Sequence, residues 1–159
     1  MKQSTIFSSL ELSVLVNSKI GSIRDETLQE INSAEGWLND TINQTLAESP
    51  IKKDKCEICN SESSKDLHHI AGRKHNFRTI TACKPCHAEL SQSQMTWDAR
   101  WYKTNQPEHI RNAFFLLGLH DILLLKSKKT ANSIYEELAK SFRQDIATLL
   151  TRDQRLDLS

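Results

Sequence analysis

Four cysteines in the middle of the chain have the spacing of a metal site. They form two Cys-x-x-Cys pairs, Cys56 with Cys59 and Cys83 with Cys86, with 23 residues between the pairs. Each pair can present two thiolates from one tight turn, and two such turns complete the tetrahedral four-sulfur set that zinc favours. A site with four sulfur ligands is coordinatively closed, so it stabilises a fold without performing chemistry. The sequence predicts structural Zn²⁺ here, and the alternative is four unlinked thiols.

Three histidines in the same segment suggest a second, different centre. His68 and His69 are adjacent, and His87 follows the second cysteine pair directly. Adjacent strand residues point to opposite sides, so His68 and His69 cannot both bind one ion from a regular strand. A neutral imidazole suits a general base, and a divalent cation neutralises charge that develops during phosphodiester hydrolysis. The alternative is that the three histidines only pack within a zinc-binding module.

Short extended segments and one helix must position these side chains. The apolar spacing favours strands at 58–59, 67–70 and 78–81, and Gly72 allows a turn between the second and the third. From Cys83 onward the sequence turns helical, with Pro85 in the first turn. A hairpin followed by a helix, with a cysteine pair at each end, can bring the three imidazoles into one cleft.

This constellation resembles the HNH nucleases, which have a ββα-metal fold. The resemblance covers about residues 54–95, roughly a quarter of the chain, and the helical flanks carry no part of it. The residues that carry it are His68-His69-Ile70, Asn76 and Cys83-x-x-Cys86-His87, framed by Cys56 and Cys59.

The resemblance also implies roles for individual residues. His68 and His87 correspond to ligands of a catalytic divalent ion, His69 to the general base, and Asn76 to the residue that steadies the base or its loop. Ser91 stands where some members of the family carry a further histidine ligand. Two imidazole ligands favour Mn²⁺, Co²⁺, Ni²⁺ or Zn²⁺ in affinity, although availability can make Mg²⁺ the working ion. The family pattern implies products with a 5′-phosphate and a 3′-hydroxyl.

Cations and aromatic residues near the histidines suggest contact with nucleic acid. A basic loop would bind the phosphates that flank the scissile bond, and its alternative is a solvated charged loop; it contains Arg73, Lys74, His75 and Arg78. A second cluster mixes aromatic and basic residues: Trp97, Arg100, Trp101, Tyr102 and Lys103. Its rings could stack on bases, but such a cluster more often caps a core, which is the interpretation we favour.

The charge distribution agrees with a modest affinity for DNA. The whole chain has 21 Lys and Arg against 20 Asp and Glu. Residues 52–103 hold 10 of these cations and 6 of the anions, which leaves 11 cations and 14 anions for the rest. Four thiolates around one zinc ion would change the local charge by about −2. We therefore expect salt-sensitive DNA binding through a few placed cations.

The segments on both sides of this centre are predicted to be helical. A helix over 24–48 would bury a stripe of Leu28, Ile31, Leu38, Ile42 and Leu46 and end before Pro50. The apolar start, 5–20, is also assigned to a helix. The arms would form a scaffold or a dimer surface.

The C-terminal segments repeat this helical pattern. A largely apolar helix over 107–126 would lie in the centre of the fold, and His109 and His120 are interpreted as structural. A last helix follows Lys128-Lys129, with Ser133 and Glu136 at capping-box spacing. Its apolar stripe is Ile134, Leu138, Phe142, Ile146 and Leu149.

These patterns predict a mainly α protein with a small zinc-stabilised ββα core, in the α+β class. We expect an N-terminal helical arm (1–50), a nuclease-like module (51–103) and a C-terminal helical region (104–159) that packs with the N-terminal arm. The apolar segment 113–125 is too short to span a bilayer and contains His120 and Asp121, and no signal peptide is recognisable. A cytoplasmic protein with reduced thiols, and with no membrane partner, is therefore expected.

Two main functions follow from the sequence. The first is a metal-dependent DNA endonuclease, with His69 as base and a divalent ion on His68 and His87, which could act as a homodimer through its helical arms. The second is an inactive zinc-stabilised module that binds nucleic acid or regulates. A protein-interaction domain built on the apolar helices is a weaker third.

Overall fold

The computed structural model describes residues 8–45 and 51–153. Helices make up 65% of it, and a two-stranded antiparallel sheet supplies the rest of the regular structure, so the fold is α+β. The elements, in chain order, are α1 (Ser9–Thr45), β1 (Lys65–His69), β2 (Thr79–Cys83), α2 (Lys84–Gln94), a 3-10 helix (Ala99–Tyr102), α3 (Glu108–Thr130), α4 (Ser133–Ser141) and α5 (Arg143–Leu150).

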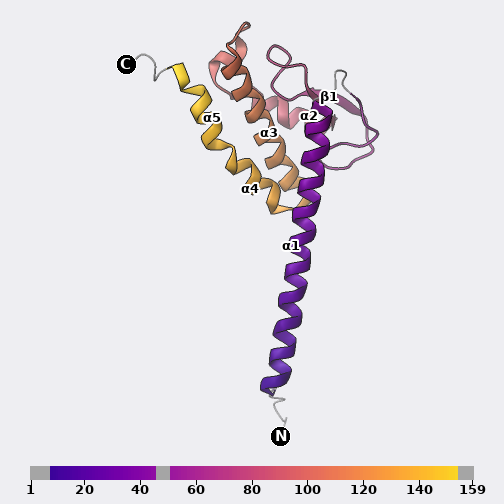
Figure 1. Ribbon diagram of the computed structural model, residues 1–159. Coiled ribbons are helices and arrows are strands. Elements are labelled where there is room, and N and C mark those ends of the chain that lie inside the picture. Colours follow the sequence, from indigo (N-terminus) through magenta and orange to yellow (C-terminus); the bar gives the residue numbers. More distant parts are fainter. Residues whose placement is uncertain (1–7, 46–50, 154–159) are drawn as a thin grey trace.

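The N-terminal arm is one uninterrupted helix, α1. Its C-terminal half lies along the other helices and its N-terminal half extends away from them (Figure 1). The predicted buried stripe is wrong in part, because Leu28 and Ile31 are 51% and 41% exposed. Ala34 and Thr41 are buried instead, and Trp37 packs beside Ala34 against α4. The side chain of Ile42, together with Leu46 and Pro50, falls outside the described residues.

The hairpin of β1 and β2 carries the adjacent histidines. The strands are antiparallel, with His68 opposite Ile80 and His69 opposite Thr79. The strand predicted at 58–59 is wrong, because these residues form a tight turn that the Asn60 N–H closes by donating to the Cys56 carbonyl at 2.9 Å. An extended backbone would direct the two cysteines of this pair apart, whereas the turn brings both to one point.

The helix that follows the hairpin begins where the sequence predicts it. Cys83 is the N-cap residue of α2, and Pro85 occupies the first turn, where its missing N–H costs no hydrogen bond. At the other end, Gln94 Nε2 donates to the His69 carbonyl at 2.9 Å and to the Ile70 carbonyl at 3.2 Å. These bonds fix α2 against the end of β1.

The long helix α3 runs through the centre of the core. Ile110, Phe114, Ile122 and Leu123 on it are all but inaccessible to solvent. A Cβ at Gly118 would lie 2.0 Å from the carbonyl oxygen of Ile70, so only glycine allows α3 to approach the end of β1 this closely.

The C-terminal region differs from its prediction in two ways. The helix is capped by Asn132, whose side chain accepts from the Ile134 N–H at 3.0 Å, and not by a box of Ser133 and Glu136. Asn132 precedes Ser133 by one residue, and its side-chain oxygen reaches the second backbone N–H of the helix, so it serves as the N-cap. The single helix predicted here is two, α4 and α5, which meet at Phe142.

Candidate metal and histidine site

The two cysteine pairs converge at one point. Their four Sγ atoms all lie within 4.8 Å of one another, and Cys59 Sγ is 3.6 Å from Cys83 Sγ. Zinc with sulfur ligands at about 2.3 Å in a tetrahedron requires sulfur atoms about 3.8 Å apart. The four cysteines can therefore hold a metal ion such as zinc. Within the described residues, no other group of three or more such ligands comes together.

Local structure at both ends of the hairpin produces this convergence. Cys56 directly precedes the turn at 57–59 and Cys59 ends it, and Cys83 and Cys86 lie at the junction of β2 with α2. The Glu57 N–H donates to the Thr81 carbonyl at 2.9 Å, and the Thr81 N–H donates to Glu57 Oε2 at 2.6 Å. This reciprocal pair anchors the turn to the middle of β2.

The thiols of the cluster differ in how readily they ionise. Burial, and after it the neighbouring thiols, raise the pKa of Cys86 far above the ordinary thiol value. Burial also raises the pKa of Cys59. Burial opposes the ionisation of Cys56 as well, but hydrogen bonds from nearby backbone N–H groups outweigh it and lower the pKa to about 7. Four thiolates at one point need a cation, and zinc fits this donor set.

A buried lysine joins the cysteine turn to the helices. Lys126 on α3 is 8% exposed, and its Nζ donates to the Glu57 carbonyl at 2.6 Å. The same nitrogen lies 4.8 Å from the ring centre of Trp37 on α1 and 5.3 Å from that of Tyr135 on α4. Burial lowers the pKa of Lys126 to about 8, and the nearby thiols and Glu57 act in the opposite direction. Local spacing did not predict a role for Lys126, although a lysine directly after three leucines in an apolar helix is unusual.

His68 and His87 meet from different elements. His68 comes from β1 and is 3% exposed, and His87 comes from the first turn of α2. Their ring centres are 5.0 Å apart and their planes are perpendicular. Burial, followed by the neighbouring His87 and His69, lowers the pKa of His68 to about 4. The ring is therefore neutral near pH 7, which is the form that binds metal ions.

The third histidine lies beside this pair and is less buried. His69 follows His68 on β1, and its carbonyl accepts hydrogen bonds from Gln94 Nε2 at 2.9 Å and from the Gly72 N–H at 3.1 Å. Burial, and after it Arg73 and His87, lower the pKa of His69. A half-exposed neutral imidazole can accept a proton from water.

The position of Ser91 affects the tautomer of His87. Ser91 Oγ, one turn further along α2, lies 3.3 Å from His87 Nδ1. When Nδ1 donates to Ser91 Oγ, Nε2 is the nitrogen left for a metal ion.

The loop between the strands contains Asn76 and the predicted basic residues. Asn76 Oδ1 accepts from the Arg78 N–H at 2.8 Å, and the Asn76 N–H donates to the Gly72 carbonyl at 3.2 Å. Asn76 therefore holds the loop in shape. Arg73 and Lys74 are exposed, and Arg78 is half-buried over the ring of Phe115 at 5.3 Å.

The structure separates His75 from the other basic residues. It is 4% exposed, its Nε2 lies 2.7 Å from the Trp101 carbonyl oxygen, and its ring packs on Phe114 at 4.8 Å between centres. A side chain in this interior position has no surface to offer a phosphate. Its assignment to the phosphate-binding loop is corrected to a packing role.

The two tryptophans of the aromatic cluster pack on the core, as the favoured interpretation of the sequence has it, whereas Tyr102 is 52% exposed. Trp97 stacks parallel to Phe114 at 6.0 Å, and its Nε1 donates to Asp121 Oδ2 at 2.9 Å. Trp101 Nε1 donates to the Ala71 carbonyl at 3.0 Å and covers Gly72, which has φ of +89°. The cluster thereby fixes the loop that follows His69.

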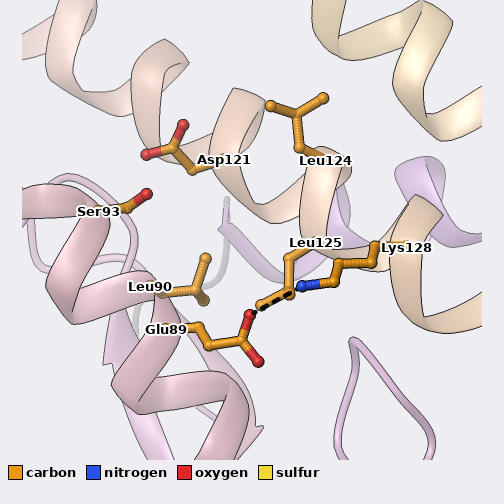
Figure 2. Close-up of a pocket in the computed structure, with 7 residues that line it drawn as sticks. All are labelled: Glu89, Leu90, Ser93, Asp121, Leu124, Leu125 and Lys128. Atoms are coloured by element: carbon orange, nitrogen blue, oxygen red, sulfur yellow. Dashed lines mark ion pairs between the residues drawn. The ribbon is translucent and has the colours of Figure 1, made fainter.

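The pocket in Figure 2 lies on a different face of α2. Glu89, Leu90 and Ser93 from α2 face Asp121 and Lys128 from α3, and the Lys128 Nζ pairs with Glu89 at 3.9 Å. Glu89 and Ser93 lie roughly 150° around the helix from His87 and its neighbours. This depression is therefore separate from the histidine centre.

Comparison of the chain with protein-family models, with curated proteins and with solved structures finds no match in any of the three. In the part of the chain that the structure describes, none of the helices combines the length and the apolar character needed to cross a membrane.

Proposed function

We propose that this protein is a metal-dependent DNA endonuclease of the HNH type. The observation that carries the proposal is the meeting of His68 and His87, whose ring centres are 5.0 Å apart at the junction of a hairpin and a helix. With metal–nitrogen distances of about 2.1 Å, two imidazoles on one ion have their ring centres about 4.6–5.3 Å apart. The pair therefore fits a shared divalent ion.

The cysteine cluster gives this pair its rigid support. Cys83 ends β2 and Cys86 lies next to His87, so a zinc ion on the four thiolates would fix the position of His87 relative to the hairpin. The proposal assigns structural Zn²⁺ to Cys56, Cys59, Cys83 and Cys86. It assigns Mg²⁺, Mn²⁺ or another divalent ion to His68 and His87.

The chemistry divides between the ion and the chain. When bound, the divalent ion supplies positive charge beside the phosphoryl oxygens and the leaving oxygen of the scissile bond. His69 accepts a proton from the attacking water, and its lowered pKa keeps it in the neutral form. Asn76 holds the loop after His69, and the Gln94 amide fixes the His69 carbonyl. Arg73 and Lys74, on the exposed part of the loop, contact flanking phosphates.

An alternative function follows from the small number of candidate metal ligands at the histidine centre. The histidine centre brings two candidate ligands together, and Ser91 occupies the place of a third. A chain of this kind that binds nucleic acid without cleaving it is the alternative. It would retain the zinc cluster and the exposed cations and lack metal-dependent cleavage.

A plasmid-nicking assay distinguishes the two functions. The full chain, loaded with zinc, is incubated with supercoiled DNA and Mg²⁺ or Mn²⁺, in parallel with His69→Ala and with His109→Ala as a control far from the centre. We expect divalent-dependent nicking by the parent and the control and at least a ~100-fold lower rate for His69→Ala with unchanged zinc content. DNA binding by the parent without cleavage under any metal would favour the alternative.

A further inference from the structure

The N-terminal half of α1 carries an apolar seam that the chain's own described residues leave open. In the C-terminal half of the helix, Ala34 and Thr41 are 1% and 2% exposed, Ala34 packs with residues of α3 and α4, and Trp37 lies between the two positions in sequence. Fourteen residues earlier on the same helix stand Ile20, Ile23 and Thr27, and two heptads keep residues on nearly the same face.

This upstream part of the seam is exposed. Val16, Ile20 and Ile23 are 45%, 49% and 64% exposed, and this stretch of α1 extends away from the other elements (Figure 1). A helix gains most of its stability in a protein from packing of its apolar face, and an exposed apolar stripe marks an interaction surface. The open seam is continuous with the interface that the rest of the chain already covers.

Contacts within the chain determine where the open seam ends on its C-terminal side. Asn132 Nδ2 donates to the Glu30 carbonyl at 3.0 Å, and from Ala34 onward α4 covers the face. The open part therefore lies before Glu30, and it includes Val16, Ile20, Ile23 and Thr27, which are all exposed.

We propose that residues 16–27 of α1 pair in antiparallel orientation with the same residues of a second copy. In an antiparallel helix pair, the first and fourth heptad positions form mixed layers. Ile20 then faces Ile23 of the second copy, and Val16 faces Thr27. The centre of this register lies between residues 21 and 22, midway between Val16 and Thr27, so all four seam residues are paired.

Charges that flank the seam decide the orientation. Lys19 and Glu26 occupy the same heptad position on one side of the seam, and Arg24 lies on the other side, all three exposed. In the antiparallel register, each Lys19 lies beside the Glu26 of the other copy, which gives two attractive pairs. In a parallel register, each Lys19 would face Arg24 of the other copy, which gives two repulsive pairs. The seam therefore selects a second copy in antiparallel orientation.

Sedimentation of the full, zinc-loaded chain over a wide concentration range tests the pairing. The mass should rise from 18.2 kDa toward twice that value. Ile20→Asp should raise the dimer dissociation constant at least about tenfold, because two buried isoleucines are replaced by charges. Ser18→Asp, on the outer face of the same turn, is the matched control and should leave the constant nearly unchanged.

Charge reversal tests the orientation. Lys19→Glu should weaken the antiparallel dimer roughly threefold, and the double variant Lys19→Glu with Glu26→Lys should restore it. A parallel dimer would instead be strengthened by Lys19→Glu. The proposal is overturned by a monomer at all concentrations, by a dimer that Ile20→Asp leaves intact, or by stronger association of Lys19→Glu. Circular dichroism of each variant verifies that the body of the protein remains folded.

Discussion

The two candidate metal centres of this protein share a hairpin and a helix but differ in how many ligands they bring together. Four cysteine sulfur atoms lie within 4.8 Å of one another, whereas the neighbouring centre has two histidines, with ring centres 5.0 Å apart. A four-ligand set leaves an ion no open position, and a two-ligand set leaves several. Under the proposed function, stability and chemistry would belong to two adjacent residues, Cys86 and His87.

The surroundings of the two centres strengthen this contrast. The cysteine turn is tied to β2 through Glu57 and to α3 through Lys126, which contacts rings from α1 and α4. The side chains of His68 and His87 contact each other and Ser91, and the adjoining end of β1 is held by Gln94 and by the close approach of Gly118 on α3. Loss of zinc from the cysteine centre should therefore loosen the whole core, whereas loss of an ion from the histidine centre should disturb only the residues around it.

The largest expected effect comes from Cys86→Ser. Zinc binding to small structural sites contributes about 10–16 kcal/mol, so loss of one thiolate should remove zinc and lower the unfolding midpoint by more than about 10 °C. Metal analysis and calorimetry of the purified variant measure this. If the parent contains no zinc and the variant unfolds at the same temperature as the parent, the structural role of the cysteine centre is wrong.

Substitution of the adjacent residue, His87→Ala, should have the opposite effect to Cys86→Ser: it should lower the nicking rate and leave zinc content and stability almost unchanged. The nicking rate should fall by about 100-fold or more, because the divalent ion loses one of its two protein ligands. Zinc content should stay the same, and the unfolding midpoint should shift by less than about 3 °C, because His87 is half-buried. Loss of zinc from this variant would mean that the two centres do not act separately.

A smaller effect is expected from Gly118→Ala, which moves the histidine strand without touching a ligand. The new methyl group would overlap the Ile70 carbonyl, so α3 or the end of β1 must shift, at a cost of about 1–3 kcal/mol in the free energy of unfolding. The nicking rate should fall in parallel, while zinc content stays unchanged.

Gly36→Ala provides the matched control for this prediction. A Cβ at Gly36, on α1, has no atom within 4 Å, and alanine favours a helix over glycine by about 1 kcal/mol. It should leave stability unchanged or raise it slightly in urea unfolding. Equal destabilisation by the two substitutions would contradict the close contact of α3 with β1.

The smallest expected effect is on DNA binding. Arg73→Ala removes one exposed cation next to His69, so affinity should fall roughly three- to tenfold and the salt dependence should become shallower by about one ion. Fluorescence anisotropy at several salt concentrations measures both quantities. Arg143→Ala, an exposed arginine on α5, is the control; if both variants bind alike, the loop makes no specific contact.

The contrast between the centres was only partly accessible from the sequence. The spacing of the two cysteine pairs predicted a four-sulfur cluster, because two residues between ligands nearly determine a tight turn. The apolar residues at 58–59 favoured a strand that conflicts with this turn, and the structure has the turn. The spacing also did not predict that Lys126, 40 residues after Cys86, would reach the same turn. Contacts between distant segments depend on packing, which local spacing does not encode.

Loop residues illustrate the same limit. Arg73, Lys74 and His75 have similar chemistry and adjacent positions, yet the first two are exposed and His75 is 4% exposed against Phe114. Sequence alone assigns a short run of cations to one surface. The turn at Gly72, covered by Trp101, rotates the third residue into the core.

The sequence by itself determined the mainly helical composition, the start of α2 at Cys83 with Pro85 in its first turn, and the four-cysteine set. Each depends on residues close together in the chain, where backbone preferences and short spacings decide the structure. The tertiary structure alone decided which face of α1 is buried, and it placed His68 and His87, from two elements, beside one another. Apolar residues occupy most faces of α1, so only packing against α3 and α4 could select Ala34 over Leu28 and leave the upstream seam open.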